Sequence, residues 1–258
     1  MQPVFCLKSK RLHIRLRPTA EAQVRAGHRW VFSESIREQS REGAAGELAI
    51  VFDRKDQFLA LGLFDPDSPI RVRIIHRGKP AQVGVDFWRD RLLVARERRS
   101  GIFDSKTNAG RWINGESDQF PGLVLDQYAD TLVLKLYSAI WFTRLEEFVS
   151  LIAKEFRPER LVLRLSRNIQ MAADARQITD PSILLGNDPV GPVVFVEGGL
   201  RFEADVLRGQ KTGFFLDQRE NRRLVGSLSA EKDVLNAFSF SGGFSLYAAR
   251  GGARSVTD

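Results

Sequence analysis

The sequence predicts a multidomain protein of mixed α/β and α+β class, with an N-terminal β-barrel, a central α+β domain and the beginning of a Rossmann-like domain. Short alternating strands separated by Gly, Asp and Pro turns occupy the first part of the chain. Strands and helices are mixed in the middle, and a strand, a small-residue loop and a helix follow between residues 233 and 250. We expect domains at residues 1–78, 79–190 and 191–258.

The composition indicates a folded, basic protein. The 258 residues include 39 Lys and Arg against 32 Asp and Glu, a net charge of +7, and 43% are hydrophobic, which is too many for a disordered chain. A single cysteine, Cys6, excludes an internal disulfide, and three scattered histidines give no zinc-site spacing. No apolar run approaches the roughly 20 residues of a membrane span. We therefore expect a cytoplasmic protein without a metal ion.

Most of the excess positive charge lies near the N-terminus. Residues 1–78 carry a net charge of +5, and each of the other two segments carries +1. Leu12, Ile14 and Leu16 alternate with polar residues, which is typical of a half-buried strand. Its exposed face would be a row of cations suited to nucleic acid, unless it is only the solvated face of a basic protein. The candidate RNA-binding residues are Lys8, Lys10, Arg11, Arg15, Arg17 and Arg29.

The other elements of the first segment follow from local signals. Thr19 can cap a short helix that ends at Gly27. A polar turn over residues 54–57 joins two apolar runs and indicates a hairpin, and a linker follows at residues 77–80. The predicted elements after the helix lie at residues 28–32, 46–53, 58–64 and 70–75.

The central segment alternates helices and strands and contains no motif that signals chemistry by itself. Asp86 would cap its first helix, which runs to about Arg99, and residues 115–122 form a loop bounded by Gly and Pro. The remaining predicted elements are a hairpin of residues 123–126 and 131–136, a helix over 145–156 and a strand over 160–165.

In the last segment a hairpin is predicted over residues 193–205 and a helix over 218–227. A strand over 233–238, the loop 239–243 and a helix over 244–250 then form the nucleotide-binding opening of a doubly wound domain. Gly242 and Gly243 would let the backbone approach a ligand closely, and the helix N-terminus would attract its carboxylate or phosphate. The alternative is a turn in which glycine only permits close packing.

A second motif, residues 209–222, combines two Gly and two Phe with several hydrogen-bonding side chains. It would suit a loop over a ligand, with Asp217 for an ammonium or hydroxyl group and Arg219 for an acid. The alternative is a salt-bridged helix start with Asp217 near its N-cap.

Residues 209–219 and 234–246 resemble the ribosomal RNA large subunit methyltransferase I family, S-adenosylmethionine-dependent enzymes that form 5-methylcytosine in large-subunit ribosomal RNA. Residues 27–32 through 71–73 resemble that family's RNA-binding PUA domain, and residues 114–123 resemble its central domain. The resemblance therefore implies S-adenosylmethionine as cofactor and large-subunit ribosomal RNA as partner. The oligomeric state, a homodimer included, stays open.

The resemblance also implies two groups of cofactor-binding residues. The first forms the pocket wall around the methionine end of the cofactor: Asn236, Phe238, Ser239, Ser241, Gly242 and Gly243. The second closes the pocket from the other side: Phe215, Asp217, Gln218 and Arg219.

The chain departs from the family in one respect. The family's nucleophilic cysteine would lie beyond Asp258, and Cys6 does not match its position. A complete doubly wound domain needs several βαβ units of roughly 30 residues each, more than residues 191–258 hold. We therefore expect a chain truncated at its C-terminus that does not transfer methyl groups by itself. The alternatives are a non-catalytic RNA-binding module and, on weaker grounds, a small-molecule methyltransferase.

Overall fold

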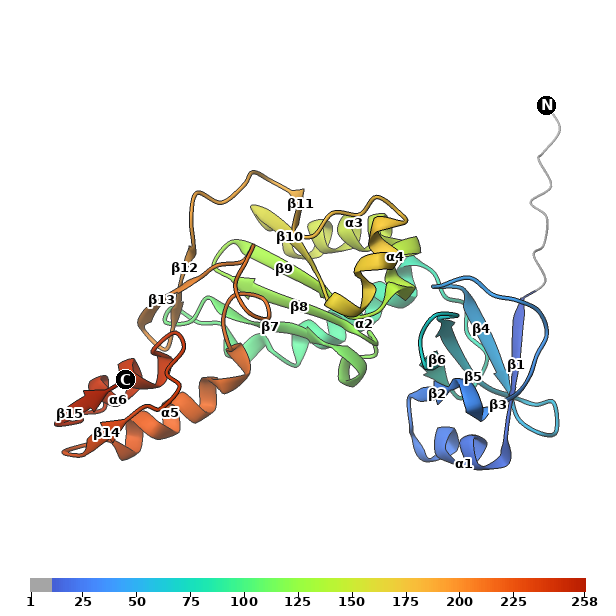
Figure 1. The fold of residues 1–258 in the computed structure, drawn as a ribbon, viewed down its shortest axis with the longest axis horizontal. Coiled ribbons are helices and arrows are strands. Elements are labelled where there is room, and N and C mark those ends of the chain that lie inside the picture. Colours follow the sequence, from blue (N-terminus) through green and yellow to red (C-terminus); the bar gives the residue numbers. More distant parts are fainter. Residues whose placement is uncertain (1–10) are drawn as a thin grey trace.

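Three groups of elements follow one another along an elongated molecule in the computed structural model, which describes residues 11–258 (Figure 1). Cys6, Lys8 and Lys10 lie outside the described residues. The N-terminal strands and the C-terminal helices occupy opposite ends, and a central sheet lies between them. This arrangement confirms the mixed fold class, whereas the exact domain boundaries stay a prediction.

The first group is a six-stranded sheet in the order β2-β6-β5-β4-β1-β3, in which only β1 and β4 pair in parallel. The predicted alternation is confirmed, since Leu12, Ile14 and Leu16 are at most 1% exposed. The elements are β1 (Leu12–Leu16), α1 (Pro18–Ala26), β2 (Trp30–Phe32), η1 (Ser33–Ser35), β3 (Ile36–Gln39), β4 (Leu48–Phe52), β5 (Phe58–Phe64) and β6 (Ile70–Arg77).

Two local predictions for this group need correction. Helix α1 begins at Pro18, and its N-cap residue is Arg17, so the prediction that Thr19 caps the helix was wrong. The fixed φ of proline suits the first helical position, where the missing N–H is not needed. Gly27 ends the helix as predicted, with a left-handed φ of 114°. Strand β3 was not anticipated, because its mostly exposed residues show no apolar alternation.

The second group is a five-stranded sheet in the order β11-β10-β9-β8-β7 with helices α2 and α3. Helix α2 begins after Gly84, so Asp86 lies in its first turn and does not cap it as predicted. Strands β7 and β11 were not predicted. The elements are α2 (Val85–Glu97), η2 (Ser100–Ile102), β7 (Ala109–Asn114), η3 (Gly115–Asp118), β8 (Leu123–Tyr128), β9 (Thr131–Leu136), η4 (Ala139–Arg144), α3 (Leu145–Phe156), β10 (Arg160–Leu165), η5 (Arg167–Ile169), α4 (Gln170–Asp174) and β11 (Ser182–Leu185).

Both faces of the central sheet are buried. Leu132, Leu134 and Leu136 belong to a core that also includes Trp88 of α2, whereas Val133 belongs to a second core with Phe195 of the next hairpin. Side chains alternate between the two faces of a strand, so β9 contributes to both cores. The central sheet therefore lies between two cores, and the C-terminal segment packs against the face that contains Val133.

The third group is a hairpin, two helices and a short parallel pair of strands, β14 and β15, connected through α6. Strand β14 ends at Leu235, earlier than predicted, because Phe238 and Phe240 adopt left-handed φ angles of 61° and 51° and turn the chain. The elements are β12 (Val193–Glu197), β13 (Leu200–Ala204), η6 (Leu216–Gln218), α5 (Arg219–Leu228), β14 (Asp233–Leu235), α6 (Gly243–Arg250) and β15 (Ser255–Thr257).

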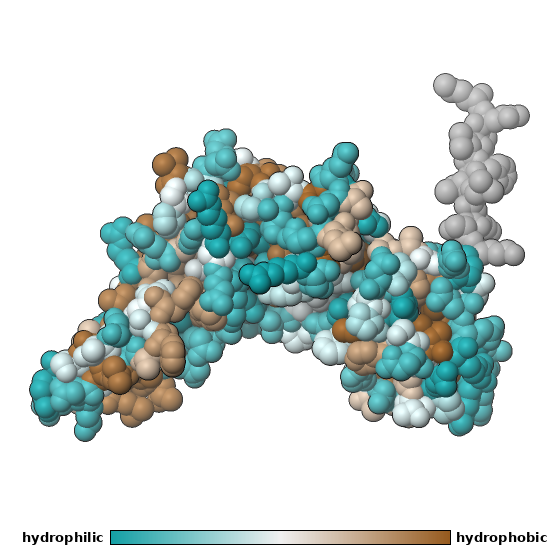
Figure 2. All heavy atoms as spheres, in the orientation of Figure 1, coloured by the Kyte–Doolittle hydropathy of each residue, from teal (hydrophilic) through white to brown (hydrophobic). Residues whose placement is uncertain are grey.

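Large apolar side chains are exposed around this last βαβ unit, and brown surface gathers there in Figure 2. They are Leu224, Leu228, Leu235, Phe238, Phe240 and Leu246. The hairpin side of the same segment is well packed, with Phe195, Phe202 and Tyr247 at most 5% exposed. The segment is therefore loosely packed at its outer end only.

Trp88 is fully buried and contacts Trp141, Phe120 and Phe148, so its replacement tests the core between α2 and α3. We expect Trp88→Ala to lower the free energy of unfolding by about 3–5 kcal/mol, because it leaves a large cavity. Urea unfolding followed by circular dichroism measures the change. Met171→Ala, at an 87% exposed position, is the control, and equal losses in both variants would contradict the assignment of this core.

Candidate functional site

The carboxyl ends of β14 and β15 bring three polar side chains together. Asn236 Nδ2 donates to Ser245 Oγ at 2.6 Å and to Asp258 Oδ1 at 3.1 Å, and Ser245 Oγ also donates to Asp258. Because the two strands are parallel, their carboxyl ends lie on one edge, beside the start of α6. This edge is where doubly wound sheets bind ligands. Asn236 was predicted at this site, and Ser245 was missed.

The two glycines before α6 have different roles. A Cβ on Gly243 would lie 3.0 Å from Arg222 Cδ and 3.4 Å from Phe214 Cζ, so this glycine permits close packing. Gly242 has a φ of 65° and nothing within 4 Å of its Cβ position, so it faces open space. It is the N-cap residue of α6, and as a glycine it has no side chain that could cap the first N–H groups of the helix. The packing interpretation holds for Gly243, and the ligand interpretation fits Gly242.

A buried ion pair holds these elements on the hairpin. Arg222 of α5 is 2% exposed and Glu197 of β12 is fully buried. The guanidinium binds the carboxylate through two parallel contacts, Nε to Oε1 at 2.8 Å and Nη2 to Oε2 at 2.7 Å. Arg222 Nη1 donates to the carbonyl of Phe215 at 2.9 Å, and its guanidinium lies over the Phe214 ring. The pair therefore joins β12, α5 and the predicted ligand-covering loop.

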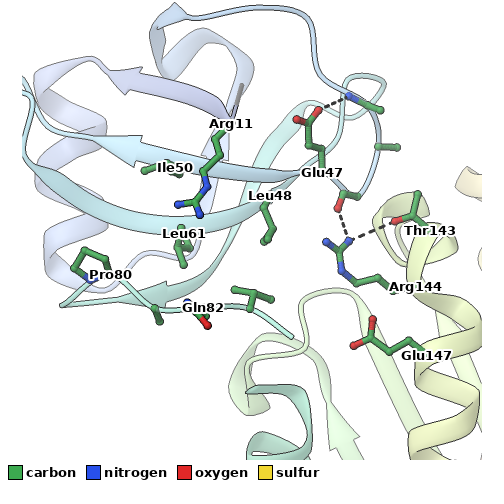
Figure 3. Close-up of a pocket in the computed structure, with 15 residues that line it drawn as sticks. Arg11, Glu47, Leu48, Ile50, Leu61, Pro80, Gln82, Thr143, Arg144 and Glu147 are labelled. Atoms are coloured by element: carbon green, nitrogen blue, oxygen red, sulfur yellow. Dashed lines mark hydrogen bonds between the residues drawn. The ribbon is translucent and has the colours of Figure 1, made fainter. Parts of the chain in front are cut away.

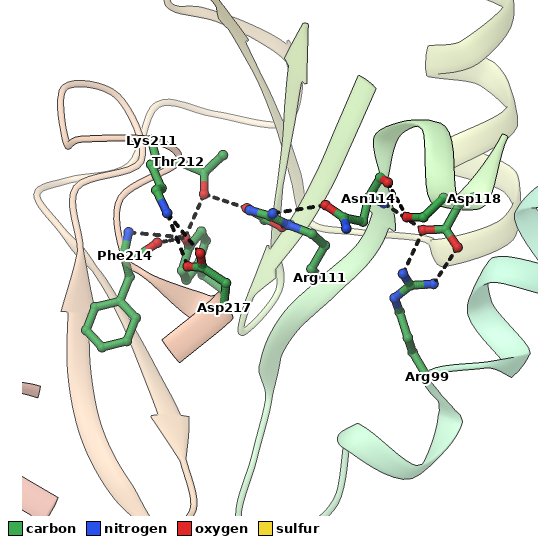
Figure 4. A network of polar contacts seen from close by, with 11 residues as sticks. Arg99, Arg111, Asn114, Asp118, Lys211, Thr212, Phe214 and Asp217 are labelled. Atoms are coloured by element: carbon green, nitrogen blue, oxygen red, sulfur yellow. Dashed lines mark hydrogen bonds and ion pairs between the residues drawn. The ribbon is translucent and has the colours of Figure 1, made fainter. Parts of the chain in front are cut away.

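The other end of that loop is fixed to the central sheet (Figure 4). Thr212 Oγ1 donates to Asp126 Oδ2 at 2.6 Å, and the Tyr128 hydroxyl lies 2.8 Å from Thr212 Oγ1. Asp126 is fully buried and is paired with Arg111, whose Nε lies 2.7 Å from Oδ1. Burial, followed by the negative charge of Asp126, raises the pKa of Tyr128, so its hydroxyl stays neutral and hydrogen-bonded. Residues 212–214 are thus rigidly placed.

Between these anchors, Lys211 and Asp217 form an ion pair with Nζ 3.0 Å from Oδ2. Burial opposes the charge of Asp217, but the Lys211 contact outweighs it and lowers the pKa of Asp217 below its ordinary value. Asp217 lies in the turn η6 and does not cap α5, whose N-cap residue is Gln218. The structure therefore agrees with the alternative interpretation of a salt-bridged helix start, in which Asp217 lies next to the N-cap residue.

The second predicted group does not gather around the glycine loop as expected. Phe215 contacts Phe240 of that loop edge-on, with ring centroids 5.1 Å apart. Arg219 instead extends to the central unit, where its Nη1 donates to the Ile102 carbonyl at 3.3 Å. Asp217 and Arg219 line a separate cavity of about 260 Å³ beside β7, together with Arg111. Tertiary contacts over more than 100 residues redirect Arg219, which sequence spacing could not show.

The first predicted group is only partly assembled. Phe238 is fully exposed, because the left-handed turn at this residue carries its side chain out into solvent. Ser241 is also exposed, and Ser239 is partly buried. Asn236 lies at the carboxyl edge of the sheet, and Gly242 lies at the N-terminus of α6 beside open space.

The predicted cation row of the barrel is partly neutralised. Arg15 is paired with Glu38 at 3.0 Å and with Asp56 at 2.5 Å. Arg11 and Arg17 are exposed, and Arg29 is partly buried. The row is therefore shorter than the sequence suggests, because strands β3 and β4–β5 bring acids to Arg15.

Arg11 also lines a cavity of about 1060 Å³ between the barrel and the central unit (Figure 3). On its far side Arg144 donates to the Gly46 carbonyl and joins the two units. A Cβ on Gly46 would lie 2.4 Å from the Ile140 carbonyl oxygen, so the backbones meet closely here. This cavity belongs to the junction of the two units and contains none of the predicted cofactor residues.

Within residues 11–258 no helix combines the length and the apolar character needed to cross a membrane. The same residues contain no cluster of His, Cys, Asp or Glu side chains that could hold a metal ion.

Comparisons with known proteins agree with the fold class. Residues 14–77 match the family model of a PUA-like domain, and residues 166–258 match that of the S-adenosylmethionine-dependent methyltransferases. A ribosomal RNA large subunit methyltransferase of Deinococcus radiodurans is 54% identical, over 96% of this chain and 62% of that protein. The ribosomal RNA large subunit methyltransferase I of Alteromonas mediterranea is 35% identical, over 94% of this chain and 61% of that protein. The chain thus spans about three fifths of the length of these curated relatives.

Solved structures show the same fold. A Streptococcus mutans protein assigned to the S-adenosylmethionine-dependent methyltransferases superposes with a TM-score of 0.79 at 21% identity, over 95% of this chain and 62% of that one. A crystal structure of a protein assigned as a methyltransferase and complexed with SAH gives a TM-score of 0.80 at 21% identity. The match covers 96% of this chain and 62% of that one.

The buried pair can be tested by a double-mutant cycle. We expect Arg222→Met to lower the free energy of unfolding by about 3–5 kcal/mol, because it leaves the Glu197 charge buried and unpaired. The double variant with Glu197→Leu should lose less than Arg222→Met alone. Chemical denaturation measures both. Arg223→Met, at an exposed pair, is the control and should change stability by less than about 0.5 kcal/mol. Additive losses would show that the two side chains do not act as a pair.

Proposed function

We propose that this homologue of the ribosomal RNA large subunit methyltransferases provides the RNA-binding and methyl-donor-binding parts of an S-adenosylmethionine-dependent ribosomal RNA methyltransferase. The observation that carries the proposal is the open backbone at Gly242, three residues before Ser245, which hydrogen-bonds Asn236 and Asp258 on the carboxyl edge of the parallel strands. The similarity of the first unit to PUA-like domains supports RNA as the substrate.

The residues at this edge fit S-adenosylmethionine. The cofactor supplies an electrophilic methyl group when it is bound. The uncapped N-terminus of α6 suits its carboxylate, and the open space beside Gly242 allows that group to approach the backbone. The carboxylate of Asp258 accepts hydrogen bonds from Asn236 and Ser245 and would accept them equally from ribose hydroxyls. These residues bind and orient the cofactor.

The finer specificity is part of the proposal. We infer that the modified atom is C5 of a cytosine in large-subunit ribosomal RNA, in the cytoplasm. That reaction requires a thiolate nucleophile. The only cysteine of these 258 residues is Cys6, which lies outside the described residues and at the opposite end of the sequence from the cofactor motif. We therefore expect the chain to bind the cofactor without transferring its methyl group to cytosine.

Cofactor binding can be tested at Gly242 against a matched glycine. Gly242→Ala adds a Cβ where the ligand would lie, so we expect at least about tenfold weaker S-adenosylmethionine binding in calorimetry. Gly252→Ala is the control, because Gly252 also has a positive φ, 86°, but follows α6 at its other end. Both variants should lose about 1–2 kcal/mol of stability from backbone strain. Equal affinity in the two variants would contradict this binding site.

The reaction can be tested with tritiated S-adenosylmethionine. A protein that carries this chain together with the remaining length of its relatives should label large-subunit ribosomal RNA, and nuclease digestion should release the label as 5-methylcytosine. The 258-residue chain alone should bind the cofactor and leave the RNA unlabelled. Label in small metabolites and not in RNA would favour a small-molecule methyltransferase and contradict the proposal. The absence of cofactor binding by both proteins would favour a non-catalytic RNA-binding module.

A further inference from the structure

Three arginines with few acidic partners meet where the barrel joins α2. Arg29 immediately precedes β2, Arg77 ends β6 and Arg91 lies in the middle of α2. Burial and the charge of Arg77 lower the pKa of Arg29, and burial and the charge of Arg29 lower the pKa of Arg91 to about 10. These are the effects of like charges held close together in a partly buried place. Burial is the larger cause for both groups, and each lies within reach of another positive charge.

Arg91 is held in a fixed position without an anion. Its guanidinium lies over the Phe87 ring, 3.6 Å from the centroid, and farther from Trp88 at 5.7 Å. Its Nη1 atom is buried and has no hydrogen-bond partner among residues 11–258. A buried donor without a partner is unfavourable, and such a group commonly serves a ligand.

The other arginines of α2 are satisfied. Arg89 is paired with Glu155 at 2.6 Å, and Arg96 donates to the Glu155 carbonyl at 2.9 Å. Arg91 therefore differs from Arg89 and Arg96 because its buried Nη1 atom has no hydrogen-bond acceptor among the described residues.

Glu116, the acid whose charge acts on Arg29, already has two hydrogen-bond donors. Glu116 Oε1 accepts from Trp30 Nε1 at 2.9 Å and from Arg73 Nη1 at 3.1 Å. Arg73 is itself buried and lacks a partner for its Nε, so the charge of Glu116, which raises the pKa of Arg29, is shared with Arg73. Arg77 donates to the Val24 carbonyl, which brings no negative charge. No ion pair of Arg29 or Arg91 occurs in the described part of the chain.

We propose that Arg29 and Arg91 together bind one backbone phosphate of the RNA substrate at the junction of the barrel and α2. The inference rests on the proposed RNA-binding function and names a contact within it. A phosphate would accept hydrogen bonds from both guanidinium groups and cancel their repulsion. The Phe87 ring orients Arg91 before RNA arrives. Because Arg29 belongs to the barrel and Arg91 to the central unit, the same phosphate would couple the two units.

Charge-removing variants of the whole chain test the proposal. We expect Arg91→Gln and Arg29→Gln each to weaken binding of a fluorescently labelled single-stranded RNA roughly tenfold, the effect of one lost charge-assisted contact. Each should also reduce the slope of log affinity against log salt concentration by about 1. Arg96→Gln, on the same helix and with the same change in charge, is the control and should bind within about twofold of the original chain.

A second measurement separates binding from folding. Because neither Arg29 nor Arg91 takes part in an ion pair of the described residues, each variant should keep its melting temperature while losing affinity. If Arg91→Gln binds RNA as well as Arg96→Gln does, the phosphate contact is overturned, but the proposed function is not. A melting temperature that falls together with affinity would also overturn the phosphate contact. An original chain that does not bind RNA would overturn the proposed function as well.

Discussion

The C-terminal part of the molecule depends on the buried ion pair between Glu197 and Arg222. A charge this deeply buried is tolerated only with a partner of matching geometry, and the two parallel contacts of the guanidinium provide that geometry. The pair also determines the packing of its neighbours. Gly243 has no room for a side chain because Arg222 lies against it, and Tyr247 of α6 donates to the Glu197 carbonyl. The start of α6 is thus positioned by a contact made on the hairpin.

The hairpin is in turn fixed to the central sheet, whose second face it covers. Asn108, just before β7, exchanges two hydrogen bonds with Val196 of β12, and Phe195 belongs to the same core as Val133 of β9. The first face carries α2 and α3, and its core reaches into the barrel through Leu61, Leu63 and Ile75. The molecule has the form of an arch, with the barrel at one end and the C-terminal segment at the other (Figure 2). Two cores, one on each face of the central sheet, therefore join the proposed RNA-binding unit to the segment that carries the proposed cofactor edge.

Local patterns predicted the parts of the structure that depend on near neighbours in sequence. The alternation of Leu12, Ile14 and Leu16 and the stop signal of Gly27 are of this kind. The buried pair gave no such signal, because Glu197 and Arg222 are 25 residues apart and each resembles a surface residue in the sequence. The directions of side chains could not be predicted from near neighbours in sequence either. Phe215 and Arg219 were expected on one side of the pocket. In the structure Phe215 contacts Phe240, whereas Arg219 extends to the Ile102 carbonyl. Resemblance indicated which segments matter, and only tertiary structure showed which side chains meet.

We propose that the loop before α6 and the part of residues 209–222 that contacts it, through Phe215 and Phe240 and the Glu197–Arg222 pair, form one cofactor-binding unit. Hydrogen–deuterium exchange of the whole chain, with and without S-adenosylmethionine, tests it most directly. We predict that the cofactor slows the exchange of backbone amides in both residues 209–222 and residues 236–246, over the same range of cofactor concentration. Protection of only one of these segments, or slower exchange confined to the barrel, would contradict it.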